Sequence, residues 1–267
     1  MYEEFTAFIA QLININICLK KDFVFELIDK FDIPIKKLYY PNNNLDNLSI
    51  SLNFYKSFNL EYYNIIRQGL NSQDIMISDE CNSHVDTKSS KAYIKLNDND
   101  GDVIILVHEF AHYIDRMLNP HIVPDKYWFL GESFAFYMER ELEKKLGQKY
   151  EYLFKIRKNN RLYTEKKLLQ IIKLALYYED EYLKTGKLEL KEEDSKNIKR
   201  IMNIGQDNLI NFCLSYPIAN ITSLYLINFC SNITKEEFCE LCLSYDIKRF
   251  FRDNCHLIGL DNKIKIK

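Results

Sequence analysis

The spacing of hydrophobic and polar positions predicts a chain that is mostly helical. Apolar residues recur every three or four positions over most of its length, which is the period of a helix with one buried face. Ala92–Leu96 alternates instead and is rich in aromatic and β-branched residues, so it is the best candidate for a strand. The polar stretch 71–90, which contains His84, predicts an exposed loop. Helices are expected over 2–31 with a break near Lys20, over 45–70, over 102–115 with Asp98 or Asp100 as N-cap, over 132–146, and through most of the chain from 148 onward.

Composition agrees with this pattern and indicates the fold class. The 267 residues include only seven glycines and five prolines, which favours long helices over a turn-rich β fold. No internal repeat, low-complexity tract or clear linker divides the chain. We therefore expect one mainly α domain over 1–267, with a possible N-terminal helical subdomain over 1–85 and the core that carries the chemistry over 86–267.

Charge and cysteine content narrow the expected partners and compartment. The formal net charge of −2 gives no reason to expect binding to nucleic acid. No apolar run reaches the roughly 18–20 residues that span a bilayer, and the N-terminus lacks the basic segment of a secretory signal. Seven scattered cysteines are typical of reduced thiols in the cytoplasm. Cys239 and Cys242, with Cys255 and His256 after them, have the spacing of a zinc pair, but their apolar neighbours favour a packed helix.

The stretch with the most specific chemistry is 102–115, DVIILVHEFAHYID. His108 and His112 are four residues apart, so on a helix they lie on one face and can both bind one metal ion. Glu109 lies beside the metal rather than on it, where it can accept a proton from a bound water. Because the surrounding positions are apolar, these polar side chains are costly to bury unless an ion satisfies them.

A third metal ligand is expected from elsewhere in the chain, because catalytic zinc sites generally have three protein ligands and one open position. Glu132 follows His112 by twenty residues and opens the next helical pattern. His121 competes with it, nine residues past His112. The extended metzincin spacing requires a histidine six residues past His112, where Leu118 stands. Spacing alone therefore leaves Glu132 and His121 open.

Three segments together resemble the oligopeptidase family of thimet oligopeptidase and oligoendopeptidase F, within the gluzincin metallopeptidases. Val107–His112 resembles the zinc helix of that family, Glu132–Glu139 its third-ligand helix and Ser215–Ile218 its late tyrosine segment. The order and rough spacing of the segments also agree. This resemblance implies a zincin-like, mainly α catalytic domain with a small β-sheet at the active-site cleft.

The resemblance also implies roles for single residues. His108, His112 and Glu132 are then the ligands of a Zn²⁺ cofactor. Glu109 is the general base, and Tyr216 stabilises the oxyanion of the tetrahedral intermediate. The implied activity is hydrolysis of a peptide bond in a peptide or protein substrate.

Two features stay open at this level. Asp115, one turn beyond His112, and Glu139, about two turns beyond Glu132, either orient the metal ligands or are charges on the helix surface. The strand predicted over Ala92–Leu96 either adds an extended substrate to its edge or is purely structural.

Three classes of function are compatible with these features, and the zinc metallopeptidase is favoured. The alternative is a zinc-bearing binding or regulatory module without turnover, because 203–215 lacks the histidine and second tyrosine usual in the family's tyrosine segment. The third is a helical interaction protein in which the motif is coincidental. Bound zinc and peptide cleavage distinguish these classes.

Overall fold

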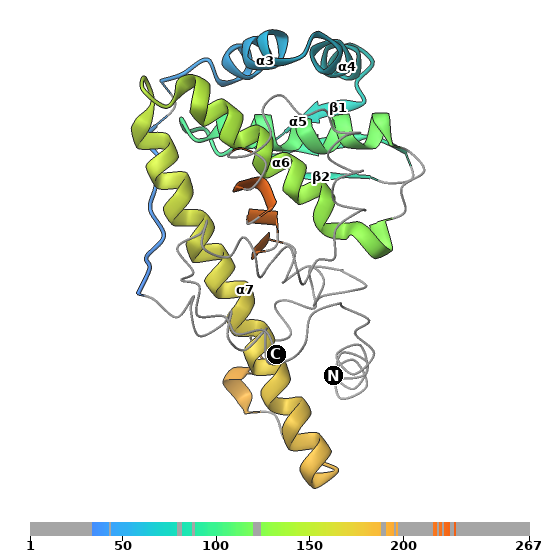
Figure 1. Ribbon diagram of the computed structural model, residues 1–267, viewed down its shortest axis with the longest axis vertical. Coiled ribbons are helices and arrows are strands. Elements are labelled where there is room, and N and C mark those ends of the chain that lie inside the picture. Colours follow the sequence, from blue (N-terminus) through green and yellow to red (C-terminus); the bar gives the residue numbers. More distant parts are fainter. Residues whose placement is uncertain are drawn as a thin grey trace.

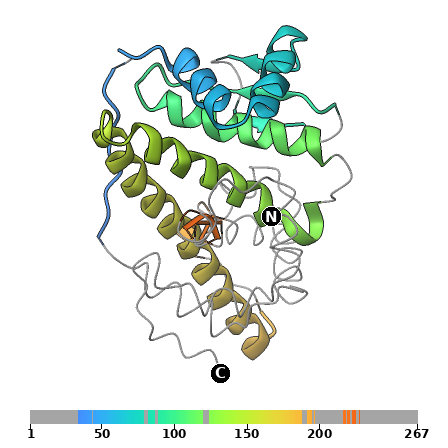
Figure 2. The same ribbon diagram turned by 45° about the horizontal axis from the view of Figure 1, so that its top comes forward.

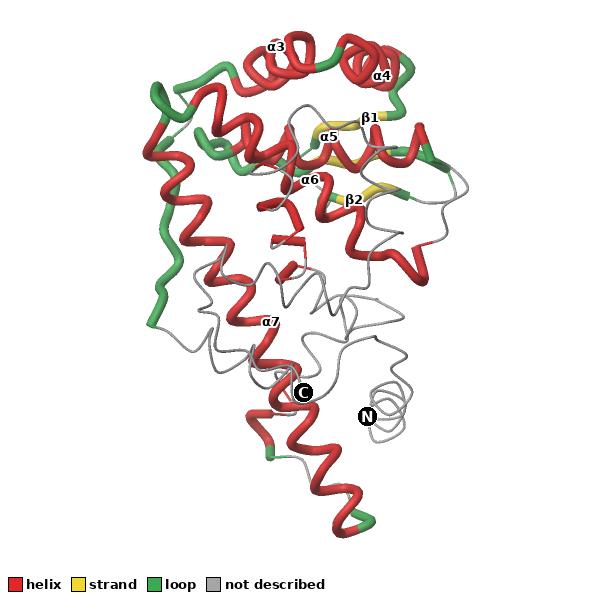
Figure 3. The backbone as a smooth tube through the Cα atoms, in the orientation of Figure 1, coloured by secondary structure: helices red, strands yellow, loops and turns green. Residues whose placement is uncertain are grey.

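The computed structural model describes most residues between 34 and 187 and a few beyond them. The described residues are 34–42, 44–78, 82–86, 89–119, 124–187, 191–194, 196, 216–217, 219–220, 222–224 and 227. They are mainly helical and include one three-stranded sheet (Figures 1 and 3), which confirms the predicted mainly α class. The helices expected over 2–31, the candidate ligand His121 and the pair Cys239 and Cys242 lie outside the described residues. Within those residues, no helix is both long and apolar enough to cross a membrane.

Helices α3 (Asn47–Phe58) and α4 (Leu60–Asn71) confirm the helical patterns predicted over 45–70. Asn59 separates them, and its side-chain oxygen accepts the N–H groups of Glu61 and Tyr62 at 2.8 and 3.2 Å. Asparagine suits this position because the first N–H groups of a helix have no partner within the helix. Figure 2 shows both helices on the same side of the motif helix.

The sheet consists of β1 (Ile75–Ile77), β2 (His84–Val85) and β3 (Ala92–Ile94) in the order β1-β3-β2. The strand predicted near Ala92 is therefore confirmed as β3, whereas the loop predicted over 71–90 is wrong at β1 and β2. The ring of His84 stacks on Tyr93, with the ring centroids 4.9 Å apart. Cross-strand contacts of this kind stabilise strands whose sequence pattern is too short to predict them.

The position of β3 in the sheet bears on whether an extended substrate could pair with its edge. β1 pairs with it in parallel along Ala92–Ile94, and β2 pairs with it antiparallel at Ala92 and Tyr93. An added peptide strand requires unpaired N–H and C=O groups along an edge. β3 therefore has no free edge at Ala92 and Tyr93.

Helix α5 (Asp102–Leu118) carries the motif and contacts α3, α4, α6, β2 and β3. The Tyr55 hydroxyl of α3 donates a buried hydrogen bond of 2.7 Å to the Val107 carbonyl, and the Ser51 hydroxyl lies 3.2 Å from the Val103 carbonyl. The buried apolar side chains of α5 join those of α3, α4 and the sheet in one hydrophobic core. This packing anchors the face of α5 that points away from the histidines.

The start of α5 differs from the predicted N-caps. Gly101 occupies the N-cap position without a side-chain bond, and the ring of Tyr40 fills the space where a Cβ would lie. Asp100, one candidate, instead accepts the N–H of Asn44 at 2.7 Å and the hydroxyl of Tyr152 at 2.9 Å. Asp98, the other, has a left-handed backbone with φ of 54°. Tertiary contacts thus replace the predicted local caps.

Helices α6 (Pro124–Leu146) and α7 (Glu151–Thr185) follow. α6 begins at Pro124, well before the predicted start at Glu132. Proline is tolerated in the first turn of a helix, where its missing N–H needs no partner. α6 packs along α5, and α7 runs down from it as the longest helix in Figure 1. α7 ends at Thr185, and Gly186 follows it as the C-cap. The φ of Gly186 is 67°, a left-handed backbone conformation that favours glycine.

Among the described residues between 216 and 227, two contact α6 through Arg140. The Arg140 guanidinium of α6 is buried and donates to the Ser223 hydroxyl at 2.9 Å and to the Asn220 side-chain oxygen. Figure 1 shows the described part of this segment in orange between α6 and α7. Arg140 therefore holds a late part of the chain against the helix that follows the motif.

Candidate metal centre

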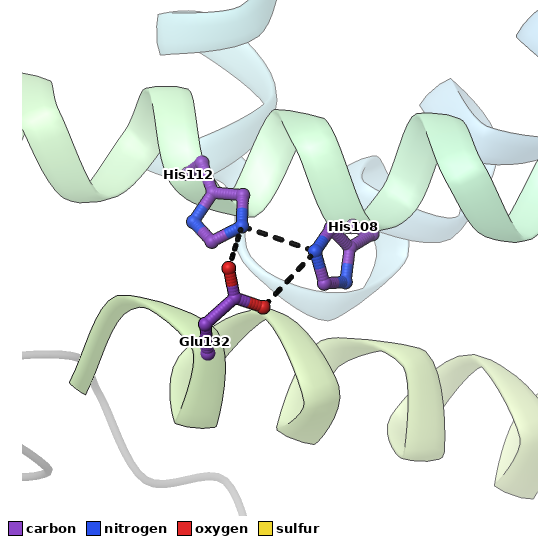
Figure 4. Close-up of side chains that lie close together, drawn as sticks. All are labelled: His108, His112 and Glu132. Carbon is purple, nitrogen blue, oxygen red and sulfur yellow. Dashed lines mark hydrogen bonds and ion pairs between the residues drawn. The ribbon is translucent and has the colours of Figure 1, made fainter. Parts of the chain in front are cut away.

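Two imidazoles of α5 point at one position between α5 and α6 (Figure 4). His108 and His112 are separated by about one helical turn, so their side chains project from the same face. Their Nε2 atoms lie 3.0 Å apart, and the two rings are nearly perpendicular at 81°. The structure therefore brings together the two histidines that the motif predicts as ligands.

Glu132 of α6 supplies a carboxylate to the same position. Its Oε1 lies 3.5 Å from His112 Nε2, and its Oε2 lies 3.5 Å from His108 Nε2. Oε2 is buried and makes no hydrogen bond to the described residues. Burial raises the pKa of this carboxyl group, although the charge of His108 opposes the increase. A buried carboxylate oxygen without a hydrogen bond is costly, so this atom suits a cation at this position.

The three side chains fit a metal ion. One ligand atom from each of His108, His112 and Glu132 lies within 4.8 Å of the others. In a tetrahedral site with bonds of about 2.0–2.1 Å, neighbouring ligand atoms are about 3.3 Å apart, and the observed separations of 3.0 and 3.5 Å lie on either side of this value. This group can therefore hold a metal ion.

Gly131 of α6 faces α5 on the side of His112 and Asp115. A Cβ on Gly131 would lie 3.4 Å from Oδ2 of Asp115 and 3.6 Å from Nδ1 of His112. The Asp115 carboxylate and the ring nitrogen of His112 that faces away from Glu132 thus both border the same glycine.

Glu139 contacts the other nitrogen of His108. Its Oε1 lies 2.7 Å from Nδ1 of His108, and the side chain is only 2% exposed. A carboxylate can only accept, so Nδ1 carries the hydrogen and Nε2 keeps its lone pair for the metal. Of the two roles left open for Glu139, a charge on the helix surface is excluded by this burial.

Two arginines of α7 surround Glu139. Arg157 donates from Nε to Oε2 at 2.8 Å and from Nη2 to Oε1 at 2.5 Å, and Arg161 donates to Oε2. Burial by itself raises the pKa of Glu139, but the charges of Arg157 and Arg161 outweigh burial and hold this pKa well below its usual range. Burial also lowers the pKa of His108, and the hydrogen bond to Glu139 and the nearby carboxylates raise it by more.

The Tyr216 ring reaches the histidine side of the site through Phe136. The Tyr216 ring packs on Phe136 with 5.7 Å between the centroids, and Phe136 lies 5.6 Å from the His108 ring. The charge of Glu132, burial and the charge of Glu109 raise the pKa of Tyr216 well above its usual value. Tyr216 is thus a protonated phenol near neutral pH.

Arg157 and Arg161 are the site residues that sequence reasoning missed. They are four residues apart in a helical stretch, so their sharing of one helix face was readable from the sequence. Their common partner, Glu139, was not readable from the sequence, because it lies on a different helix, α6. Comparisons of this chain with protein-family models, with curated proteins and with solved structures found no match.

Proposed function

We propose that the protein is a zinc-dependent metallopeptidase that hydrolyses peptide bonds in a peptide or protein substrate. The observation that supports this most is the meeting of His108, His112 and Glu132, in which the buried Oε2 of Glu132 makes no hydrogen bond to the described residues. Two imidazoles and one carboxylate form a ligand set suited to zinc that leaves a coordination position open. The proposal extends the observed helical fold to a zincin-like catalytic domain similar to oligoendopeptidase F and thimet oligopeptidase.

The chemistry divides between the cofactor and the side chains of this chain. Zinc, when bound, supplies a Lewis acid that makes water more acidic and polarises the substrate carbonyl. Glu109, next to His108, accepts the proton of the attacking water and delivers it to the leaving amine. The Tyr216 phenol, kept protonated by its surroundings, donates a hydrogen bond to the oxygen that gains negative charge.

The test is metal content combined with peptide cleavage. Purified protein should contain about one zinc per chain, by elemental analysis, as expected for three protein ligands around one ion. Cleavage of a broad peptide library should stop when a chelator is added and return when zinc is restored. A chain without zinc contradicts the proposal.

A second function is favoured by one observation in the sequence. Residues 203–215 contain neither a histidine nor a tyrosine, although both are usual at this place in the family that the chain resembles. A zinc-bearing binding or regulatory module would not need them. Stoichiometric zinc without cleavage of any library peptide would favour this alternative over the peptidase.

Tyr216→Phe tests the oxyanion role. Removal of one donor to a developing oxyanion typically lowers kcat by about 10²–10³-fold, and we expect a decrease of this size with little change in KM. The zinc content should not change, because the proposed ligands are His108, His112 and Glu132. Steady-state kinetics on one cleaved peptide measures this, and an unchanged kcat would remove Tyr216 from the mechanism.

A further inference from the structure

The contacts of Glu139 link the candidate metal centre to a helix that supplies none of its ligands. Glu139 and Glu132 both belong to α6, but Arg157 and Arg161, which grip Glu139, belong to α7. Arg157 binds both carboxylate oxygens through two of its donors. This paired geometry fixes the plane of a carboxylate, which a single donor does not.

We propose that Arg157 and Arg161 are positioning residues for the metal centre. They hold the Glu139 carboxylate in the orientation in which it accepts from Nδ1 of His108, and this bond directs Nε2 of His108 at the metal. The inference rests on the metal-binding part of the proposed function. It makes metal affinity depend on the docking of α7.

The packing around Arg161 supports a fixed arrangement. Its guanidinium lies 4.2 Å from the centroid of the Phe136 ring, and the same ring contacts His108. The Arg161 side chain is 6% exposed and the Glu139 side chain 2% exposed. Buried groups with several partners lose little further freedom when a ligand binds, so the imidazole is oriented before the metal arrives.

The direction of the effect distinguishes positioning from simple electrostatics. Two guanidinium groups near a divalent cation repel it through space, so their removal by itself strengthens metal binding. If they act through Glu139, their removal frees the carboxylate, the His108 ring loses its fixed orientation, and metal binding weakens. The two mechanisms therefore predict opposite changes in zinc affinity.

The experiment measures zinc affinity by competition with a chromophoric chelator. Arg157→Gln and Arg161→Gln should each weaken zinc binding, by up to the roughly 10–100-fold that follows from loss of the group bonded directly to a ligand, here Glu139. Lys158→Gln is the matched control, because Lys158 forms an exposed ion pair of 2.7 Å with Glu143 between the same two helices and is absent from the contacts of Glu139. Its zinc affinity should equal that of the parent.

Two further variants keep the test decisive. Arg157→Lys retains the charge without the paired donors, so it should also weaken binding, and it replaces Arg157→Gln if the neutral variant does not fold. In a Glu139→Gln background, Arg157→Lys should add little further loss, because the carboxylate through which Arg157 acts is gone. The visible spectrum of the cobalt-substituted protein should change with Arg157→Lys and stay constant with Lys158→Gln, since it reports ligand geometry directly.

Unchanged or tighter zinc binding in the arginine variants would overturn the inference, as would an equal loss in the Glu139→Gln background. These outcomes leave the proposed function intact, because the parent still binds zinc. A parent protein that binds no zinc would instead contradict the proposed function itself.

Discussion

A Glu109→Gln variant is expected to lose peptide hydrolysis while it keeps its zinc. The amide has nearly the same size as the carboxylate, but it cannot accept a proton from the attacking water. General-base catalysis contributes about 10²–10⁴-fold to rate, so kcat should fall by this factor. Zinc affinity should stay close to that of the parent, because Glu109 is not one of the three grouped ligands.

The measurement is cleavage of one library peptide by parent and variant, with zinc content determined for both. Glu61→Gln is a suitable control, because it removes the same charge from an exposed position on α4, outside the grouped ligands. The control should cleave at the parent rate. A Glu109→Gln variant that cleaves at the parent rate would show that another group is the base.

Glu132→Gln is expected to weaken zinc binding by more than about a hundredfold. Loss of an outer partner typically costs 10–100-fold in metal affinity, and the loss of a charged ligand should cost more. Zinc that saturates a site at 1,000 times its Kd stabilises the folded protein by about 4 kcal/mol. Most of this zinc-dependent increase in thermal stability should therefore disappear in the variant.

Without metal, the same substitution should have the opposite effect on stability. The pKa of Glu132 is raised in the folded protein, mainly by burial. A carboxyl group with a raised folded pKa destabilises the fold once the pH exceeds its unfolded pKa of about 4.3, because the unfolded chain ionises more easily. At pH 7 with chelator, Glu132→Gln should therefore be at least as stable as the parent.

Thermal melts with chelator and with zinc measure both effects in the same samples. With zinc, the parent should melt at a higher temperature than Glu132→Gln. With chelator, the two melting temperatures should be equal, or Glu132→Gln should melt at the higher one. If Glu132→Gln binds zinc as tightly as the parent, Glu132 is not a ligand. If the variant is much less stable with chelator, its carboxylate serves the fold rather than a cation.

The motif helix shows what can be predicted from the spacing of residues that are close in sequence. The four-residue separation of His108 and His112 places both imidazoles on one face, since this relation depends only on helix geometry. The apolar positions around them predict the burial of α5, and alternation predicts β3. In each case the interacting residues are close in sequence, so a short pattern is sufficient.

Other predictions fail where distant contacts compete with local preferences. Asp98 and Asp100 have good N-cap side chains, yet Asp100 binds Asn44 and Tyr152 instead. The polar pattern predicts loop at β1 and β2, because strands of two or three residues have no readable alternation and form only through pairing with β3.

The amino-acid sequence alone was sufficient for the helical class and for the histidine pair on one helix face. It also predicted Glu132 as the third member of the group, through a resemblance of motifs to the oligopeptidases, whereas the role of Glu109 stays a prediction. Three features required the packed fold: Glu132 faces the histidines, Glu139 is buried against His108, and Tyr216 lies beside Phe136. Residues on one helix are related by a fixed rise and rotation, whereas contacts between α5, α6 and α7 depend on how whole side-chain surfaces pack. Arg157 and Arg161 therefore acquire their contacts with Glu139 only when α7 docks.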